Sequence, residues 1–144
     1  MKAAQYALEK KAADIHVLDL TGITSMTDYF VVATGSSDRQ VKAIAENVIA
    51  EMRDTEGVRA WRSEGWDSLQ WVIIDFVDFV VHIFHPTARL YYNIERLWAD
   101  APMVEVIDEP IPAKPARWKK KSAAAPITDA KIKVISDSRA RLST

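Results

Sequence analysis

A continuous apolar run ends abruptly at a glycine between residues 27 and 40, in the sequence TDYFVVATGSSDRQ. Tyr29–Thr34 contains no charged residue, which is the pattern of a strand covered on both faces of a sheet. After Gly35, either Ser36 or Ser37 can accept a hydrogen bond from a free backbone N–H group and cap a helix. This strand, turn and helix constrain the chain to an α/β fold in which the strand lies inside its sheet.

The segment after this turn has the period of an amphipathic helix. Its apolar residues recur three and four positions apart, at Val41, Ile44, Ala45, Val48, Ile49 and Met52. Gly57 predicts the end of this helix, since glycine is favoured just past a helix C-terminus. We expect further strands at Asp14–Leu20 and at Val58–Arg62.

Residues 71–84, WVIIDFVDFVVHIF, predict a hairpin of two strands. With Phe76 and Val77 as a two-residue loop, Asp75 lies opposite Asp78, and residue 71 lies opposite residue 82. Side chains alternate between the two faces of a strand. One face is then wholly apolar and is predicted to be core, with Val72, Ile74, Phe79, Val81 and Ile83.

The other face of this hairpin mixes apolar and ionisable residues, namely Trp71, Ile73, Asp75, Asp78, Val80 and His82. Burying carboxylates without partners is costly, so this face is either solvated or built to meet a partner. Two carboxylates beside a large aromatic residue suit a basic, partly apolar protein surface. Metal binding and a plain solvent-exposed face are the alternatives.

Pro86 predicts the start of the last helix, because proline is favoured at the first helical position. An apolar stripe on this helix is expected to pack on the sheet, formed by Leu90, Tyr91, Ile94, Leu97 and Trp98. Together these elements predict one α/β domain over residues 1–100, with a mixed sheet of about five strands and packed helices.

Charge divides the chain into two parts. Residues 1–100 contain 10 Lys and Arg against 15 Asp and Glu, a net charge of −5, whereas residues 101–144 contain 9 against 5, a net charge of +4. Five of the six prolines lie beyond residue 100, which predicts a flexible, disordered tail. The acidic domain suits a basic protein partner better than nucleic acid. The tail sequence KPARWKKK suits contact with RNA phosphates, or it only solvates the chain.

Several classes of function are excluded by what the sequence lacks. It has no cysteine, which excludes a disulfide framework, a thiolate metal site and a catalytic thiol. It also has no phosphate loop, zinc-protease helix or nucleophile elbow. Glu9, Lys10 and Lys11 interrupt the first apolar residues, so a signal peptide is not expected, and no segment is long enough to cross a membrane. We therefore expect a cytoplasmic protein with no cofactor and no bound metal.

These motifs, in this order, resemble the ribosomal silencing factor (Iojap) family over roughly Ala12 to Trp98. The resemblance implies a protein that is not an enzyme and binds the large ribosomal subunit through the fourteenth large-subunit ribosomal protein. Such a protein blocks joining with the small subunit and represses translation under nutrient limitation. The resemblance also implies a nucleotidyltransferase-like topology and a homodimer in the free state. Contact between the basic tail and ribosomal RNA is an expectation from the residues alone.

The resemblance also implies which residues form the site. The partner-binding residues are Trp71, Asp75, Asp78, His82 and Glu64, with Trp71 filling an apolar recess in the partner. A supporting turn contains Asp28, Gly35, Ser37 and Arg39. Val77 departs from the family, whose members usually have glycine between the two aspartates. Because a β-branched residue resists positive φ, we expect a different turn here and an altered geometry of the two aspartates.

The alternative function is that of a nucleotidyltransferase-like enzyme or nucleotide-binding protein. Gly35 and Ser36 resemble the Gly-Ser turn with which such enzymes hold nucleotide phosphates. These enzymes also need two carboxylates, two residues apart on one strand, to hold their metal ions. No such pair lies on a strand predicted after Gly35, which favours binding over catalysis.

Overall fold

The computed structural model describes residues 1–107 and 132–134. In chain order, its elements are α1 (Lys2–Glu9), β1 (Ala13–Asp19), β2 (Tyr29–Thr34), α2 (Asp38–Asp54), β3 (Arg62–Glu64), β4 (Trp71–Asp75), β5 (Phe79–Phe84), α3 (Pro86–Tyr92), α4 (Ile94–Leu97), β6 (Met103–Val106) and β7 (Ile132–Val134). The predicted α/β class is confirmed. None of the described helices has the length and apolar composition needed to span a membrane.

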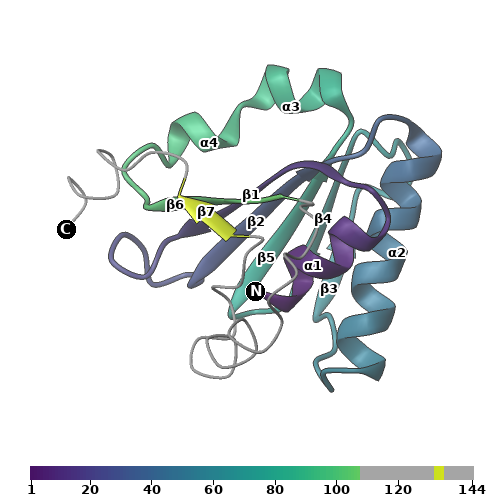
Figure 1. Cartoon of the computed structure of the whole chain (residues 1–144), viewed down its shortest axis with the longest axis horizontal. Coiled ribbons are helices and arrows are strands. Elements are labelled where there is room, and N and C mark those ends of the chain that lie inside the picture. Colours follow the sequence, from purple (N-terminus) through teal and green to yellow (C-terminus); the bar gives the residue numbers. More distant parts are fainter. Residues whose placement is uncertain (108–131, 135–144) are drawn as a thin grey trace, which may run out of the picture.

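The seven described strands form one mixed sheet in the order β3-β4-β5-β2-β1-β6-β7 (Figure 1). Strands β2 and β5 run parallel, and the other neighbouring pairs are antiparallel. The predicted interior position of Tyr29–Thr34 is confirmed, since β2 lies between β5 and β1. The sheet has two more strands than the five predicted, because β6 and β7 are formed by residues after position 100.

The sheet continues past the predicted domain boundary at Asp100. Strand β6 pairs with β1, and Ala101, Met103 and Val106 are buried. A four-residue strand placed directly after Pro102 is too short to show an apolar period, which is why the sequence pattern missed it. Residues 108–131 and 135–144, which hold most of the predicted basic tail and its KPARWKKK segment, lie outside the described residues.

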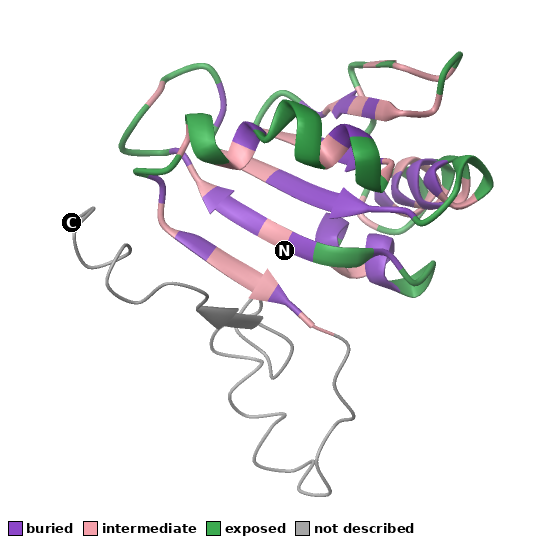
Figure 2. Cartoon of the chain, turned by 90° about the horizontal axis from the view of Figure 1, so that it is seen from above, coloured by how far each residue is buried: buried purple, intermediate pink, exposed green. Residues whose placement is uncertain are grey.

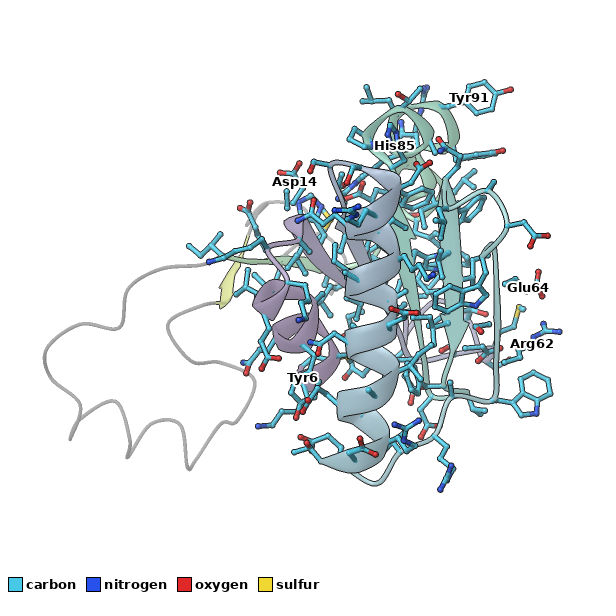
Figure 3. All side chains as sticks on the ribbon, turned by 90° about the vertical axis from the view of Figure 1, so that its right-hand side faces the viewer. Tyr6, Asp14, Arg62, Glu64, His85 and Tyr91 are labelled. Carbon is cyan, nitrogen blue, oxygen red and sulfur yellow. The ribbon has the colours of Figure 1, made fainter. Side chains whose placement is uncertain are left out.

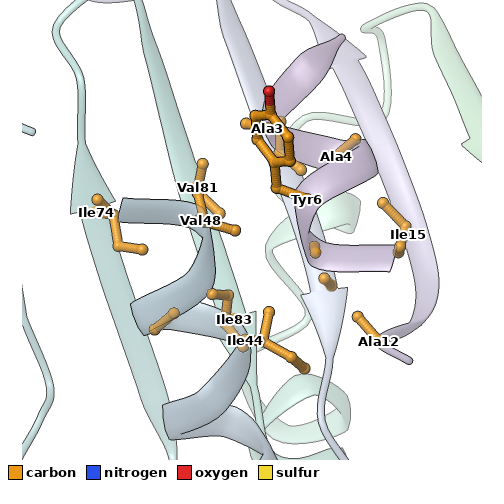
Figure 4. Close-up of a cluster of buried hydrophobic side chains, with 14 of the residues drawn as sticks. Ala3, Ala4, Tyr6, Ala12, Ile15, Ile44, Val48, Ile74, Val81 and Ile83 are labelled. Atoms are coloured by element: carbon orange, nitrogen blue, oxygen red, sulfur yellow. The ribbon is translucent and has the colours of Figure 1, made fainter. Parts of the chain in front are cut away.

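One face of the sheet packs against α1 and α2 and forms the larger core. Both helices contribute side chains to this core, which also contains the strand residues Ile15 and Ile83 (Figure 4). The helix residues are Tyr6 from α1 and Ile44 and Val48 from α2. The hairpin residues predicted to be apolar core all lie on this side, and four of them are fully buried: Val72, Ile74, Val81 and Ile83. The predicted division of the hairpin into two faces is therefore confirmed.

The other face is only partly covered, by α3 and α4. Ala88 and Ile94 pack there against Phe84 and neighbouring strand residues. The predicted apolar stripe is confirmed only for Ile94 and Trp98, which pack on the sheet. It is wrong for Leu90, Tyr91 and Leu97, which are 83%, 80% and 77% exposed, and the outer side of α3 is green in Figure 2. The left-handed conformation of Asn93 (φ 43°) ends α3 and starts α4, so a single helical stripe is not maintained.

The glycine turn after β2 is built as the sequence predicts. A Cβ at Gly35 would lie only 2.8 Å from the backbone nitrogen of Val41. The first turn of α2 can therefore pack this closely only because residue 35 has no side chain. Of the two candidate caps, Ser37 is the N-cap, and its Oγ accepts a hydrogen bond from Gln40 N–H at 3.2 Å. Gly57 (φ 73°) reverses the chain shortly after α2, near its predicted end.

The third strand begins later than predicted. Val58 and Ala60 pack against the core from a loop, and pairing with β4 starts only at Arg62. The predicted strand at Val58–Arg62 is therefore wrong. Its apolar residues pack on the core but do not pair with a neighbouring strand. Strand β3 is the short edge strand of the sheet.

Candidate partner-binding face

The register of the β4–β5 hairpin differs from the prediction by two residues. Trp71 lies opposite Phe84, Ile73 opposite His82, and Asp75 opposite Val80. The predicted pairings of Trp71 with His82 and of Asp75 with Asp78 are wrong. Phe76 is buried and its ring stacks on Phe79 with centroids 4.7 Å apart, which draws Phe76 into the ladder. The two-residue loop is consequently Val77 and Asp78.

The expectation that Val77 would avoid positive φ is wrong, because its φ is 77°. Several hydrogen bonds hold the turn in place. The Val77 N–H donates to the Asp75 carboxylate at 2.8 Å, the Asp78 N–H donates to the Phe76 carbonyl at 3.0 Å, and the Thr27 hydroxyl donates to the Val77 carbonyl at 3.2 Å. Asp75 therefore stabilises the turn as well as contributing charge.

Trp71 is held by contacts within the chain. Its indole stacks on Phe84 (centroids 4.9 Å apart) and lies against Tyr92 (4.7 Å), and its Nε1–H donates to Nδ1 of His82 at 3.1 Å. The ring is half-buried in this cluster. An indole fixed on several sides is poorly placed to reach into a recess of another protein.

His82 is buried, with 6% of its surface exposed. Because indole N–H only donates, Nδ1 of His82 is an acceptor, so the proton of the neutral ring is on Nε2. Nε2 has no hydrogen-bond partner among the described residues. Burial lowers the pKa of His82 to about 4, which keeps the ring neutral at physiological pH.

The remaining predicted partner-binding residues lie on an open surface. We use the name hairpin face for Glu64, Ile73, Asp75, Asp78 and Val80, which lie on β3, β4, β5 and the hairpin turn and are half-buried or exposed. Arg62 and Glu64 lie close together at the edge of the sheet (Figure 3). The Arg62 guanidinium is 3.8 Å from the Asp75 carboxylate, an exposed pair that contributes little stability.

The predicted supporting turn is divided between the two ends of the sheet. Asp28 precedes β2 and lies at the hairpin tip, where its N–H donates to the Asp78 carbonyl at 2.8 Å. Gly35, Ser37 and Arg39 follow β2, whose six residues separate them from Asp28 by about 20 Å. Asp28 and Arg39 are therefore too far apart to form an ion pair. Asp28 joins the acidic residues of the hairpin tip.

The Gly35–Ser36 turn uses its polar groups internally. The Ser36 N–H and hydroxyl both donate to Oε1 of Gln40, at 2.6 and 2.7 Å. Nor do the described residues contain a group of three or more His, Asp or Glu side chains placed to hold a metal ion. The arrangement thus resembles a helix cap more than a phosphate site.

A second polar cluster, which the sequence pattern did not indicate, lies at the opposite end of the sheet from the hairpin tip. Arg89 donates to both carboxylate oxygens of Glu95, to the Asp14 carbonyl and to the Thr34 hydroxyl, and His16 also bonds to Glu95. Burial raises the pKa of Glu95, but hydrogen bonds to His16 and Arg89 outweigh this and hold it at about 2. Because four of its five N–H groups donate within the chain, we interpret Arg89 as a link that ties α3 and α4 to the sheet.

Comparison with known proteins assigns the chain to a family. The family model described as "Ribosomal silencing factor during starvation" matches residues 1–131. The chain belongs to the ribosomal silencing factor family. It is similar to ribosomal silencing factor RsfS of Bacillus subtilis, with 44% identity covering 72% of this chain and 87% of the relative. It is also similar to the chloroplastic protein Iojap of Zea mays, with 34% identity covering 72% of this chain and 44% of the relative.

Solved structures agree with this assignment. A crystal structure of a Chromobacterium violaceum protein is 38% identical, with a TM-score of 0.63, and the match covers 78% of this chain and 90% of that one. A Bacillus halodurans structure is also 38% identical, with a TM-score of 0.60, covering 67% and 89%. The silencing factor family is by name a regulator of the ribosome, and no catalytic activity is indicated for this member.

In this silencing factor family member, we expect acid to destabilise the fold through His82. The folded pKa is about 4 and the unfolded value about 6.5, so between these values only the unfolded chain binds a proton. The free energy of unfolding should therefore fall by about 3 kcal/mol as the pH drops through this window. Glu95 has the depressed pKa of a paired carboxylate, so its contribution is lost at lower pH, from about 4.5 towards 2.

Urea denaturation at several pH values tests this expectation. The matched variant is His82→Gln, which keeps an acceptor for the Trp71 indole but has no titratable ring. Its stability should change less between pH 7 and pH 4 than that of the wild type. Equal pH dependence in the two proteins would show that His82 is not the group responsible.

Proposed function

We propose that the chain binds the large ribosomal subunit through the fourteenth large-subunit ribosomal protein and blocks joining with the small subunit. In this way it lowers translation when nutrients are short. Family membership supports the ribosome as the target and is consistent with repression of translation. We place this action in the cytoplasm, where subunits join.

The hairpin face is the observation that carries the proposed site. At the hairpin tip, the Asp28 N–H donates to the Asp78 carbonyl, and the Asp75 carboxylate accepts from the turn. Half-buried Ile73 and Val80 lie on the adjoining strands. Helices α3 and α4 leave this part of the sheet uncovered. An acidic surface with an apolar centre complements a basic protein that binds ribosomal RNA, and it favours fast, salt-sensitive association.

In this proposal, the five predicted partner-binding residues have two different roles. Glu64, Asp75 and Asp78 contact the partner directly. Trp71 and His82 lie on the same face, nearer the other end of the hairpin, and hold it in shape through their mutual hydrogen bond and aromatic contacts. Loss of binding in a Trp71 variant would therefore not by itself identify a contact residue.

Self-association in the free state is part of the same proposal. Leu90, Tyr91 and Leu97 form an exposed apolar surface on α3 and α4, of the kind that subunit interfaces cover. Contact between the tail and ribosomal RNA also stays a proposal, since the tail segment lies outside the described residues.

Asp78→Lys is the sharpest test of the proposed site. The Asp78 side chain is exposed, and its backbone groups make the turn contacts, so the variant should keep wild-type thermal stability. Placing a lysine against a basic partner should weaken binding to large subunits about tenfold or more. Co-sedimentation with purified large subunits at several salt concentrations measures this effect.

The matched control is Glu46→Lys, which makes the same change of charge on the exposed side of α2, beyond the opposite face of the sheet. It should bind as the wild type does. Unchanged binding by both Asp78→Lys and Asp28→Lys would rule out the hairpin tip as the contact surface.

A further inference from the structure

A recess opens beside the hairpin tip, on the partly covered face of the sheet. Its volume is about 200 Å³, and it lies between the loop that precedes β2, the hairpin and Trp98. The wall is mainly apolar, with Leu20, Met26, Phe30, Val77, Val80 and Trp98 among its residues. An apolar cavity of about 150 Å³ accommodates a benzene ring, so this recess has room for an aromatic ring or a leucine side chain.

The rim of the recess exposes apolar side chains. Met26 is 86% exposed and Val77 is 57% exposed, on two loops that are fastened to each other. The Thr27 hydroxyl donates to the Val77 carbonyl, and the Asp28 N–H donates to the Asp78 carbonyl at 2.8 Å. The opening is thus fixed by hydrogen bonds between the two loops.

One polar residue of the wall, His82, offers no accessible hydrogen-bonding group to an occupant. Its Nδ1 accepts from the Trp71 indole, and its Nε2 is buried. The wall at His82 is therefore imidazole ring surface, which suits an apolar occupant.

The charge around the opening specifies what kind of segment approaches it. Asp75 lines the recess, and Asp28 and Asp78 lie on the joined loops next to it. No lysine or arginine lines the recess. An apolar side chain carried on a basic segment fits this combination, because its stem enters the recess while neighbouring lysines or arginines meet the carboxylates.

We propose that this recess receives one apolar side chain, of leucine or phenylalanine size, from a basic segment of the ribosomal protein partner. This inference rests on the proposed function and reverses the expected direction of insertion. The sequence suggested that Trp71 fills a recess in the partner. In the structure, Trp71 is fixed within the chain and the recess belongs to this protein.

Val80→Phe tests the proposal by filling the recess from β5 with a residue that strands favour. It should weaken binding to large subunits at least about tenfold while leaving the thermal midpoint unchanged or higher. Thr55→Phe, at the exposed end of α2, controls for the added ring.

The possible outcomes separate this inference from the proposed function. If Val80→Phe binds as tightly as the wild type, the recess is not used, although the proposed function stands. If the wild type itself does not bind large subunits, the proposed function fails. If Val80→Phe unfolds, Thr24→Leu fills the recess from the opposite loop, and the same criteria apply to it.

Discussion

Trp71→Ala is expected to lower the free energy of unfolding by about 3 kcal/mol or more. The substitution removes the indole that stacks on Phe84 and contacts Tyr92, and it leaves the buried Nδ1 of His82 without its donor. Both losses occur inside the chain. Chemical denaturation followed by circular dichroism measures the effect directly.

Trp71→Phe is the matched variant, because it keeps a ring against Phe84 but cannot donate to His82. Its expected loss is smaller, about 1 kcal/mol, which is typical of an unmade buried hydrogen bond. Wild-type stability in Trp71→Ala, together with lost ribosome binding, would contradict this account and make Trp71 a direct contact with the partner.

Gly65→Ala is expected to lower the free energy of unfolding by a similar amount, about 3 kcal/mol or more. Gly65 has φ 95°, and a Cβ built on it would lie 1.9 Å from the carbonyl oxygen of Trp71. The alanine can be accommodated only if the backbone before β4 moves, and this movement would displace Trp71 and its cluster.

Two other glycines separate the causes of this effect. Gly57 has φ 73° but open space where a Cβ would lie. Gly57→Ala should therefore lower the free energy of unfolding by only about 1 kcal/mol, the cost of a left-handed backbone for alanine. Gly22 has neither positive φ nor a close neighbour, and Gly22→Ala should lie within about 0.5 kcal/mol of the wild type. Thermal or urea unfolding of the three variants gives this order. Equal losses at Gly57 and Gly65 would show that the contact with Trp71 is unimportant.

Much of the fold follows from local patterns in the sequence. The apolar run at Tyr29–Thr34, the glycine turn and the helical period after it all correspond to elements of the structure, because each is set by burial on one or two faces. The alternation in residues 71–84 correctly assigned the hairpin faces. Register was missed because a shift of two residues preserves every face assignment, and the stacking of Phe76 on Phe79 decides between the two registers.

The site was only partly predictable, because its decisive contacts join residues distant in sequence. Acidic residues at 75 and 78 could be recognised as candidates for contact with a partner. The burial of His82 by Phe30 and Trp71 depends on how three strands and α3 meet. Likewise, Asp28 and Arg39 flank a whole strand, so their separation depends on where the strand begins and ends.

Strand β6 could not be predicted from its own sequence for a different reason. Four residues after a proline, in a basic and proline-rich part of the chain, give no periodic signal of their own. Their place is set by the unpaired edge of β1, which needs a hydrogen-bonding partner. Only the assembled sheet reveals that need.

A subunit-joining assay measures whether the purified protein keeps the two ribosomal subunits apart. Large subunits are incubated with wild-type protein or Asp78→Lys, small subunits are added, and the joined ribosomes are measured by sucrose-gradient sedimentation. Wild-type protein should sediment with large subunits and reduce the joined fraction, whereas Asp78→Lys should do neither at the same concentration. Normal joining while wild-type protein is bound to the large subunit would show that the protein does not block joining.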